Sequence, residues 1–457
     1  MSRNIPQVIE SVIKNDLCIG CGICVFKCPN NALEMKWNRL GFLVPELNDN
    51  CDSDGNCLSV CPFNPIPDEE VKTEYEIAEL FLHGNTQYHP KIGKYFNIYA
   101  GYANEYRLTS SSGGIATFIF AELLERGIVD YIFSVQEANK PGVYYEYAIN
   151  STKEELLNAS KTRYFPVSLG TVLPKIRALN GKVAIVGVAC FIKGIRLAQH
   201  KDSMLKEKIP FLAGIICGGV KSRFFTEYLA GKAGVKNHFE HPQFRIKDLK
   251  STAGDYSFGC LNKTDHTEHT IKMRSVGDMW GTGMFKNNAC DFCDDVTTEL
   301  ADISLGDAWL PPFNKDGAGT NVIVTRSEIA EKLIWDGIQE NKLTIETLPP
   351  ERFLASQQGS FNHRHLGLVY RIKHAQKKMQ PLPPKRFGNE KLLLDFKIVQ
   401  RVRMKVRLKS LEVWAKNPDV LFFDRTMKKY LKQLKLSTKV YHYRRAIARR
   451  LKKSLTR

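Results

Sequence analysis

Four cysteines near the N-terminus constrain this chain more than any other feature. In the stretch "CIGCGICVFKCP" they stand at positions 18, 21, 24 and 28, and a proline follows the last one. This spacing lets three thiolates on one tight loop bind three corners of an iron–sulfur cube, while the fourth cysteine reaches a second cluster. Gly22 lets the backbone wrap closely around the first cube. The spacing therefore predicts a domain that carries iron–sulfur clusters.

A second copy of this motif, "CDSDGNCLSVCP", begins at Cys51. A shift of 33 positions maps each cysteine of the first copy onto a cysteine of the second, except that Cys21 maps onto Asp54. The segment resembles a two-cluster bacterial-type ferredoxin over about residues 10–70. The rule that the fourth cysteine crosses to the other cluster then assigns the ligands. The first site comprises Cys18, Cys21, Cys24 and Cys61, and the second comprises Cys28, Cys51, Cys57 and Asp54.

Asp54 leaves the nature of the second site open. It could bind iron through oxygen and give a [4Fe–4S] cluster with a labile corner. The corner iron could be missing, which gives a [3Fe–4S] cluster, or the second site could be empty.

The total of 12 cysteines in 457 residues predicts metal or redox chemistry rather than disulfides, because we find no secretion signal. No apolar run reaches the length that a membrane-spanning helix needs. We therefore expect a cytoplasmic protein of two to four domains.

From about residue 97 onward, strand-like apolar runs alternate with helix-like segments, as in "GKVAIVGVACFIKGIRLA". This alternation predicts an α/β domain with a largely parallel sheet. Cys190 and Cys217 follow two such strands, and Cys290 and Cys293 form a C-x2-C pair. Four thiolates could hold a third [4Fe–4S] cluster or a zinc ion. Cys260 is left without a role.

The order of several further motifs resembles the beta-subunit family of coenzyme F420 hydrogenases and dehydrogenases over roughly residues 95–350. These motifs are "SSSGGIATFIFAELLERGIVD", "ASKTRYFPVSLG", "GKVAIVGVACFIKGIR", "FLAGIICGGVKSRFF", "FRIKD", "ACDFCDDVTTELADISLGDAW" and "GTNVIVTR". The resemblance implies an iron–sulfur oxidoreductase that binds FAD and exchanges electrons with a partner or substrate, the deazaflavin coenzyme in archaeal members. Relatives fused to a ferredoxin also accompany bacterial surface-polysaccharide genes, and this chain resembles that branch.

The resemblance also implies a set of flavin-site residues in this chain. They are Ser112, Gly113, Gly114, Lys161, Tyr164, Gly187, Gly306 and Asp307. One departure from the family pattern concerns the turn at Gly187, which reads "GVAC" where the family has Gly-Thr-Pro-Cys. The missing Thr hydroxyl and Pro ring put a flavin or substrate contact from that turn in doubt.

The C-terminal region is strongly basic. Residues 361–457 hold 28 Lys and Arg against 5 Asp and Glu, whereas the other 360 residues hold 38 basic and 43 acidic groups. After the linker "QPLPPKR", apolar side chains recur at steps of three and four with basic residues opposite. Such a helix suits an anionic membrane surface or an acidic partner, and no nucleic-acid-binding motif accompanies it. The histidines at 266, 269, 363 and 365 are expected in loops or on the surface.

Together these patterns predict a ferredoxin-type domain fused to an α/β flavoprotein domain and a basic helical tail. The expected segments are residues 1–75, 95–175, 176–355 and 381–457. The expected function is transfer of electrons from the clusters through FAD to a substrate, for which a sugar nucleotide or a lipid-linked sugar is the candidate. The alternative is an electron-transfer subunit, without catalysis of its own, in a larger redox complex. The expected partners are a redox protein or a small-molecule substrate, and the tail could add peripheral contact to the inner membrane surface; no nucleic acid is expected.

Overall fold

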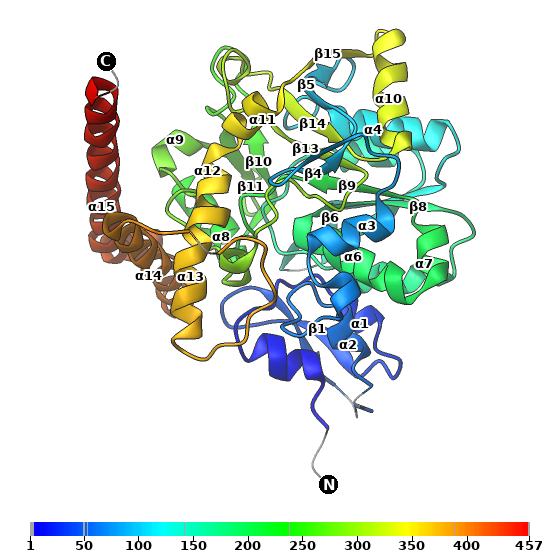
Figure 1. Ribbon diagram of the computed structural model, residues 1–457, viewed down its shortest axis with the longest axis horizontal. Coiled ribbons are helices and arrows are strands. Elements are labelled where there is room, and N and C mark those ends of the chain that lie inside the picture. Colours follow the sequence, from blue (N-terminus) through cyan, green and yellow to red (C-terminus); the bar gives the residue numbers. More distant parts are fainter. Residues whose placement is uncertain are drawn as a thin grey trace.

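The computed structural model describes residues 4–48, 51–52, 54–140, 142–236, 238–388 and 390–455. Residues 1–3 and 456–457, at the outer ends of the first and last expected segments, lie outside this range. An eight-stranded sheet in the order β15-β5-β14-β13-β9-β8-β6-β7 forms the centre of the described chain (Figure 1). Its strands are β5 (Ile98–Ala103), β6 (Tyr131–Lys140), β7 (Val143–Asn150), β8 (Val183–Val188), β9 (Phe211–Ile215), β13 (Ile303–Asp307), β14 (Asn321–Thr325) and β15 (Leu343–Thr347).

The central sheet is mixed, with a parallel centre and antiparallel flanks. Strands β13, β9, β8 and β6 pair in parallel, and β5 runs in the same direction. Strands β7, β14 and β15 run the other way. The expected α/β class is therefore confirmed, and five of the eight strands share one direction. The link from β6 to β7 is too short for the crossover that a parallel pair needs.

Both faces of the central sheet are covered, which explains the uninterrupted apolar strands. Ala184, Phe211 and Ile303 belong to the core on the side of α4 (Ile115–Glu125) and α10 (Glu328–Gln339). Alternate strand residues point to the opposite side, where α6 (Ala189–Lys201), α3 (Glu74–Phe81) and the N-terminal segment share one core. That core contains Val183, Ile185 and Leu212.

The N-terminal segment contains two similar halves, each with a short helix that follows a glycine. Gly22 precedes α1 (Ile23–Phe26) with φ 78°, and Gly55 precedes α2 (Asn56–Ser59) with φ 74°. This left-handed backbone favours glycine, so the 33-residue repeat is matched in backbone conformation. Strands β1 (Leu33–Trp37) and β2 (Leu43–Leu47) pair antiparallel beside these helices.

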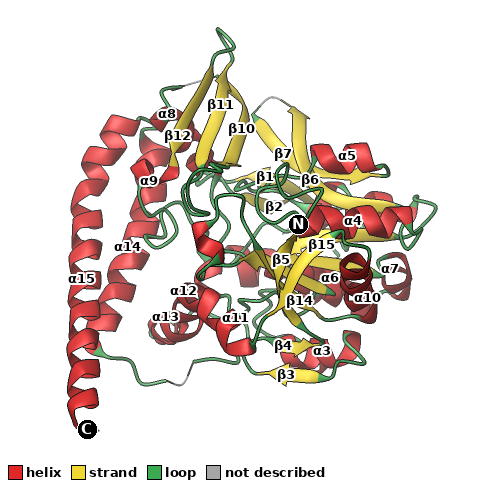
Figure 2. Cartoon of the chain, turned by 90° about the horizontal axis from the view of Figure 1, so that it is seen from above, coloured by secondary structure: helices red, strands yellow, loops and turns green. Residues whose placement is uncertain are grey.

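A second sheet and the C-terminal helices form the other side of the molecule (Figure 2). Strands β10 (Phe239–Ile246), β11 (Ser257–Asn262) and β12 (Glu268–Lys272) pair antiparallel beside α8 (Arg223–Lys232). Helices α14 (Leu394–Lys416) and α15 (Val420–Leu455) lie side by side. The remaining elements are β3 (Gln87–His89), β4 (Gly93–Tyr95), α5 (Lys153–Asn158), α7 (Ser203–Lys208), α9 (Met273–Val276), α11 (Pro350–Ser356), α12 (Gln358–Phe361) and α13 (Gly367–Gln376).

The helical pattern of the tail was predicted correctly, but its apolar face has a different neighbour. Val399, Val402 and Val406 of α14 are buried in one core with α8 and the second sheet. An amphipathic helix covers a protein core as readily as a membrane, and the sequence pattern alone does not distinguish the two. None of the described helices is long and apolar enough to cross a bilayer.

Candidate functional site

Most cysteines of the N-terminal segment belong to one core or pack against it. Burial raises the pKa of Cys61 well above its usual value, and the nearby Cys21 and Cys18 raise it further. Cys61 thus lies with the first copy of the motif. Burial also raises the pKa of Cys57, with Cys51, Asp54 and Cys28 as neighbouring negative groups.

Asp54 lies beside Cys57, but its carboxylate has a local partner. Its Oδ1 accepts a hydrogen bond from the backbone N–H of Asn56 at 3.0 Å, and its Oδ2 accepts one from the Asn56 side-chain amide at 2.5 Å. The side chain is exposed. The carboxylate of Asp54 thus holds Asn56, the first residue of α2, whereas Gly55 is the N-cap of that helix and no side chain caps it.

Cys190, Cys217, Cys290 and Cys293 form a third group at the end of the central sheet. Burial raises the pKa of Cys190 well above its usual value, and Cys293, Cys290 and Cys217 act in the same direction. Cys190 lies in the first turn of α6, which begins at Ala189 directly after β8, so Gly187 belongs to a strand and not to the expected turn. Cys217 follows β9, Cys290 lies within the 3-10 turn Ala289–Phe292, and Cys293 follows that turn directly.

This third group already holds the hydrogen bonds that thiolate ligands require. The backbone N–H groups of Gly219 and Val220 point to Cys217 Sγ at 3.1 Å and Cys290 Sγ at 3.2 Å, respectively. Among the described residues, no His, Cys, Asp or Glu group is set to hold a single metal ion. Four thiolates on one zinc each lie about 2.3 Å from that ion, whereas a cube holds them on four separate irons and therefore farther apart.

Arg364 is the charged residue closest to the third cysteine group. Its side chain is buried and donates to Cys293 Sγ at 3.1 Å and to the backbone oxygens of Cys217 and Asp295. The expectation that the "HRH" histidines lie on the surface is wrong, because His365 is 4% exposed and His363 also packs inside. The three residues lie in the turn that leads directly into α13. His363 and Arg364 find polar partners there, whereas His365 Nδ1 is buried without a hydrogen-bond partner among the described residues.

The first and third cysteine groups are direct neighbours. Cys21 is among the residues that raise the pKa of Cys190, and both lie next to the buried ring of Tyr147. The backbone oxygen of Cys21 accepts a hydrogen bond from Leu169 at 2.9 Å. Gly194 lets α6 approach α1, because a Cβ there would meet Ile23 at 2.5 Å. The two cysteine groups therefore share a single core.

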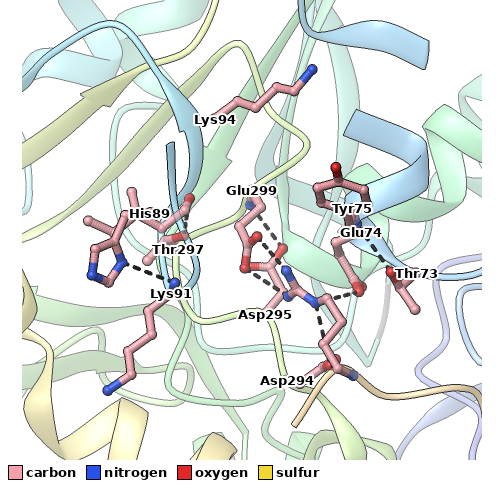
Figure 3. Close-up of polar contacts among 12 residues, drawn as sticks. Thr73, Glu74, Tyr75, His89, Lys91, Lys94, Asp294, Asp295, Thr297 and Glu299 are labelled. Carbon is pink, nitrogen blue, oxygen red and sulfur yellow. Dashed lines mark hydrogen bonds and ion pairs between the residues drawn. The ribbon is translucent and has the colours of Figure 1, made fainter. Parts of the chain in front are cut away.

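A dense set of charges fixes the chain segments around the third group. Arg386, in the expected linker, donates to Glu299 at 2.6 and 2.8 Å and lies 3.6 Å from Glu74 and 3.7 Å from Asp294. Figure 3 shows these three carboxylates and Asp295 turned toward one another. Burial and the neighbouring Glu299 and Glu74 raise the pKa of Asp295 to about 7. The linker is thus anchored beside the loop that follows Cys293.

Several of the expected flavin-site residues meet at the ends of β5 and β13. The backbone oxygen of Ser112 accepts a hydrogen bond from Lys247 at 2.7 Å, and Asp307 pairs with Arg245 at 2.6 Å. Burial lowers the pKa of Lys247 to about 8, and the nearby Arg245, Arg107 and Lys161 lower it further.

Tyr164 and three glycines complete the comparison with the expected flavin site. Burial raises the pKa of Tyr164, which lies near Arg245 and Asp307. Gly113 and Gly114 pack tightly, since a Cβ would lie 2.7 Å from Asn321 and from Tyr106, respectively, and Gly306 precedes Asp307 in β13. Gly187 is not part of this group, because it underlies α6.

Lys161 was identified from the sequence, but the other cationic residues of this group were not. We call Arg107, Lys161, Arg245 and Lys247 the cationic cluster. The Nε of Arg245 is buried without a hydrogen-bond partner among the described residues, as are two nitrogens of the nearby Arg163. Unpartnered buried donors and several cations fit the diphosphate of a flavin dinucleotide. The available signal was "FRIKD", in which Arg245 belongs to β10 and Lys247 follows that strand directly.

This arrangement is typical of iron–sulfur proteins that deliver single electrons to a second redox group. Comparisons with known proteins agree. The family described as "Coenzyme F420 hydrogenase/dehydrogenase, beta subunit" matches with its N-terminal part at residues 98–174 and its C-terminal part at residues 180–351. A "4Fe-4S dicluster domain" matches residues 17–64. The chain belongs to this beta-subunit family and carries an N-terminal ferredoxin domain, which confirms the resemblance drawn from the motifs.

Several curated proteins are similar to this chain. The coenzyme F420 hydrogenase subunit beta of Methanosarcina barkeri is 26% identical over 57% of this chain and 86% of its own length. The F(420)H(2) dehydrogenase of Methanosarcina mazei has a subunit that is 22% identical over 76% of this chain and 89% of its own length. The coenzyme F420-dependent sulfite reductase of Methanocaldococcus jannaschii is 25% identical over 71% of this chain and 46% of its own length.

A solved structure was also found. It is the F420-reducing [NiFe] hydrogenase complex of Methanosarcina barkeri, in which the matching chain is 20% identical with a TM-score of 0.46. The match covers 64% of this chain and 95% of the other.

Proposed function

We propose that the protein is an iron–sulfur flavoprotein oxidoreductase in which electrons enter at the ferredoxin clusters and pass through a third [4Fe–4S] cluster to FAD. The core that Cys21 and Cys190 share carries this proposal, because it joins the ferredoxin segment to the third cysteine group. Electron transfer needs such short steps through a packed interior, and Tyr147 fills the space beside both thiols.

The flavin would occupy the cationic cluster. Arg245 and Lys247 would bind its diphosphate, and Tyr164 would pack nearby among aromatic rings. The centroid of the Tyr164 ring lies 4.8 Å from that of Trp280 and 5.5 Å from that of Phe244. A bound flavin accepts electrons one at a time and delivers them in pairs. The chain itself supplies the charges that hold the cofactor and the buried surroundings that exclude water.

The proposed substrate is a sugar nucleotide or a lipid-linked sugar of surface-polysaccharide synthesis. Both carry a diphosphate, which the cationic residues at the sheet ends would attract. The relatives named for coenzyme F420 make that deazaflavin the natural comparison substrate. Reduction of the sugar compound, but not of coenzyme F420, is the expected outcome with the purified protein.

Anaerobic purification with iron, sulfide and flavin analysis tests the redox proposal. Cys190→Ser is expected to lower the iron content by about four atoms per chain if a cube is held there. Cys260→Ser is the matched control, because Cys260 is buried within β11, outside the three cysteine groups. Iron content that stays the same in Cys190→Ser, or protein without flavin, would contradict the proposed path.

The alternative is an electron-transfer subunit without a reaction of its own. The relatives named as subunits of hydrogenases and dehydrogenases favour this candidate. It predicts that the isolated protein is reduced and reoxidised by redox partners but converts none of the sugar compounds. Turnover of a small molecule by the isolated protein would exclude it.

We also propose that the protein works in the cytoplasm, in peripheral contact with a membrane through α15. Leu436, Val440, Tyr443 and Ile447 are 41–70% exposed at steps of three and four residues. Basic residues such as Lys439 and Arg444 lie beside them in the sequence. An apolar stripe with basic neighbours binds anionic bilayers in the plane of the interface.

A further inference from the structure

A groove lies between the segment 276–284 and residues 431–443 in the middle of α15. Its volume is about 1150 Å³. Val276 and Met284 line it from one side, and Leu431, Leu434 and Val440 line it from α15. Each of these side chains is apolar, so a ligand with a long apolar part would displace water from them favourably.

The same groove carries an excess of positive charge. Arg403, Lys435, Lys439 and His442 line it, with Asp278 as the acidic residue in the lining. An amphiphile with an anionic head matches this combination of apolar and cationic side chains.

Arg403 is the most informative residue of the groove. Its Nε is buried without a hydrogen-bond partner, and the described residues offer its guanidinium no hydrogen bond or ion pair. Buried arginine nitrogens almost always have acceptors, so this one indicates a ligand that supplies them. Burial lowers the pKa of Arg403, and the negative charges of Asp291 and Asp278 act against that shift. A phosphate group offers a guanidinium two acceptor oxygens in a fitting geometry.

The position of the groove favours a lipid over an acidic peptide. Val440 and Tyr443 belong both to its lining and to the exposed apolar stripe of α15. Figure 1 shows α15 along the outside of the molecule, with its C-terminal end away from the ferredoxin segment. A helix that lies in a bilayer interface would therefore place the groove next to lipid chains.

We propose that this groove binds a phosphate-bearing lipid, with the chain against the apolar lining and the phosphate on Arg403. The inference rests on the proposed membrane contact of α15, but not on the redox path. The phosphate lipid could be a bulk phospholipid or a polyprenyl phosphate, which share the recognised chemistry. The latter source would link the groove to a lipid-linked substrate.

Lipid binding to the full-length holoprotein tests the proposal. Fluorescent phosphatidylglycerol and a polyprenyl phosphate are titrated separately, with phosphatidylcholine as the neutral comparison. Arg403→Gln is expected to weaken binding of the phosphate lipid by roughly tenfold or more, because a charge-assisted contact is lost. Arg401→Gln is the matched control, because it removes the same charge from the same helix. Arg401 is exposed and lies outside the lining of the groove. The phosphate lipid that binds more tightly identifies the source.

A second variant keeps the test independent of folding effects at Arg403. Val440→Asp places a negative charge in the lining at a side chain that is 46% exposed, so the fold should tolerate it. It is expected to abolish lipid retention as well.

Sedimentation with anionic vesicles separates the groove from the membrane contact. The proposed lipid site in the groove would be overturned if Arg403→Gln and Val440→Asp retained lipid as well as the wild type. Vesicle binding that persists in that case would leave the proposed membrane contact of α15 intact. Absence of vesicle binding in the wild type would overturn both. Equal affinity for phosphatidylcholine, or displacement of the lipid by an acidic peptide, would overturn the assignment to a phosphate lipid.

Discussion

Arg364 is expected to set the reduction potential of the proposed third cluster. Its guanidinium is buried and lies 3.1 Å from Cys293 Sγ. The charge of a cluster becomes more negative by one unit on reduction, and a nearby cation stabilises the reduced form. Arg364→Gln removes that cation while keeping a side chain that can donate hydrogen bonds, so the potential should fall.

The size of the fall follows from Coulomb's law. A unit charge about 6 Å from the cluster centre interacts with the added electron by about 3 kcal/mol at an effective dielectric constant of about 20. This energy corresponds to about 120 mV for a one-electron couple. Water that enters the vacated space would screen part of the effect, so we expect a fall of about 60–120 mV.

A redox titration followed by EPR measures this potential. Arg364→Lys is the matched control, because it keeps the charge and should shift the potential much less than Arg364→Gln. The backbone oxygens of Cys217 and Asp295 lose a donor in the Gln variant, so its stability should fall by about 1–3 kcal/mol. A potential unchanged within roughly 20 mV, or one that rises, would refute the electrostatic role of Arg364 and the cluster beside it.

Further predictions concern the second cluster, the ferredoxin contact and the flavin site. Asp54→Cys should replace a [3Fe–4S] EPR signal by a [4Fe–4S] signal, and an unchanged cluster inventory would show that Asp54 does not occupy a ligand position of the second cluster. Gly194→Ala should destabilise the protein by about 1–3 kcal/mol in thermal unfolding, because the new Cβ meets Ile23. Gly359→Ala should not destabilise the protein, because the added Cβ would have no other atom within 4 Å. Flavin affinity should fall as the pH rises through about 8, where Lys247 loses its proton. Lys247→Gln should abolish this pH dependence. A pH-independent affinity in the wild type would contradict the role of Lys247. The lowered pKa of Lys247 also means that the unfolded chain holds more protons between about pH 8 and 10.5, so stability should rise with pH there.

The sequence indicated an iron–sulfur domain, which the 4Fe-4S dicluster match at residues 17–64 confirms, because the proposed ligands lie close together along the chain. The motif at Cys18 and its copy at Cys51 each occupy one loop, so their spacing encodes both the sites and the crossing of Cys28 and Cys61. The alternation of strands and helices likewise placed Cys190 after a strand. The opposite direction of β14 and β15 did not follow from this pattern, because strand direction depends on which neighbours a strand finds in the folded sheet.

What only the tertiary structure decided depends on contacts between distant parts of the chain. Arg364 meets Cys293 across 71 positions, and Arg245 meets Asp307 across 62. Such long-range contacts leave no periodic pattern in the sequence. A buried charged residue therefore looks the same in its local sequence as a solvated one. The tail shows the same limit, since the spacing around Val402 predicts an amphipathic helix but not whether protein or lipid covers it. Local spacing determined the chemistry that one loop can hold, and long-range packing determined which charges surround it.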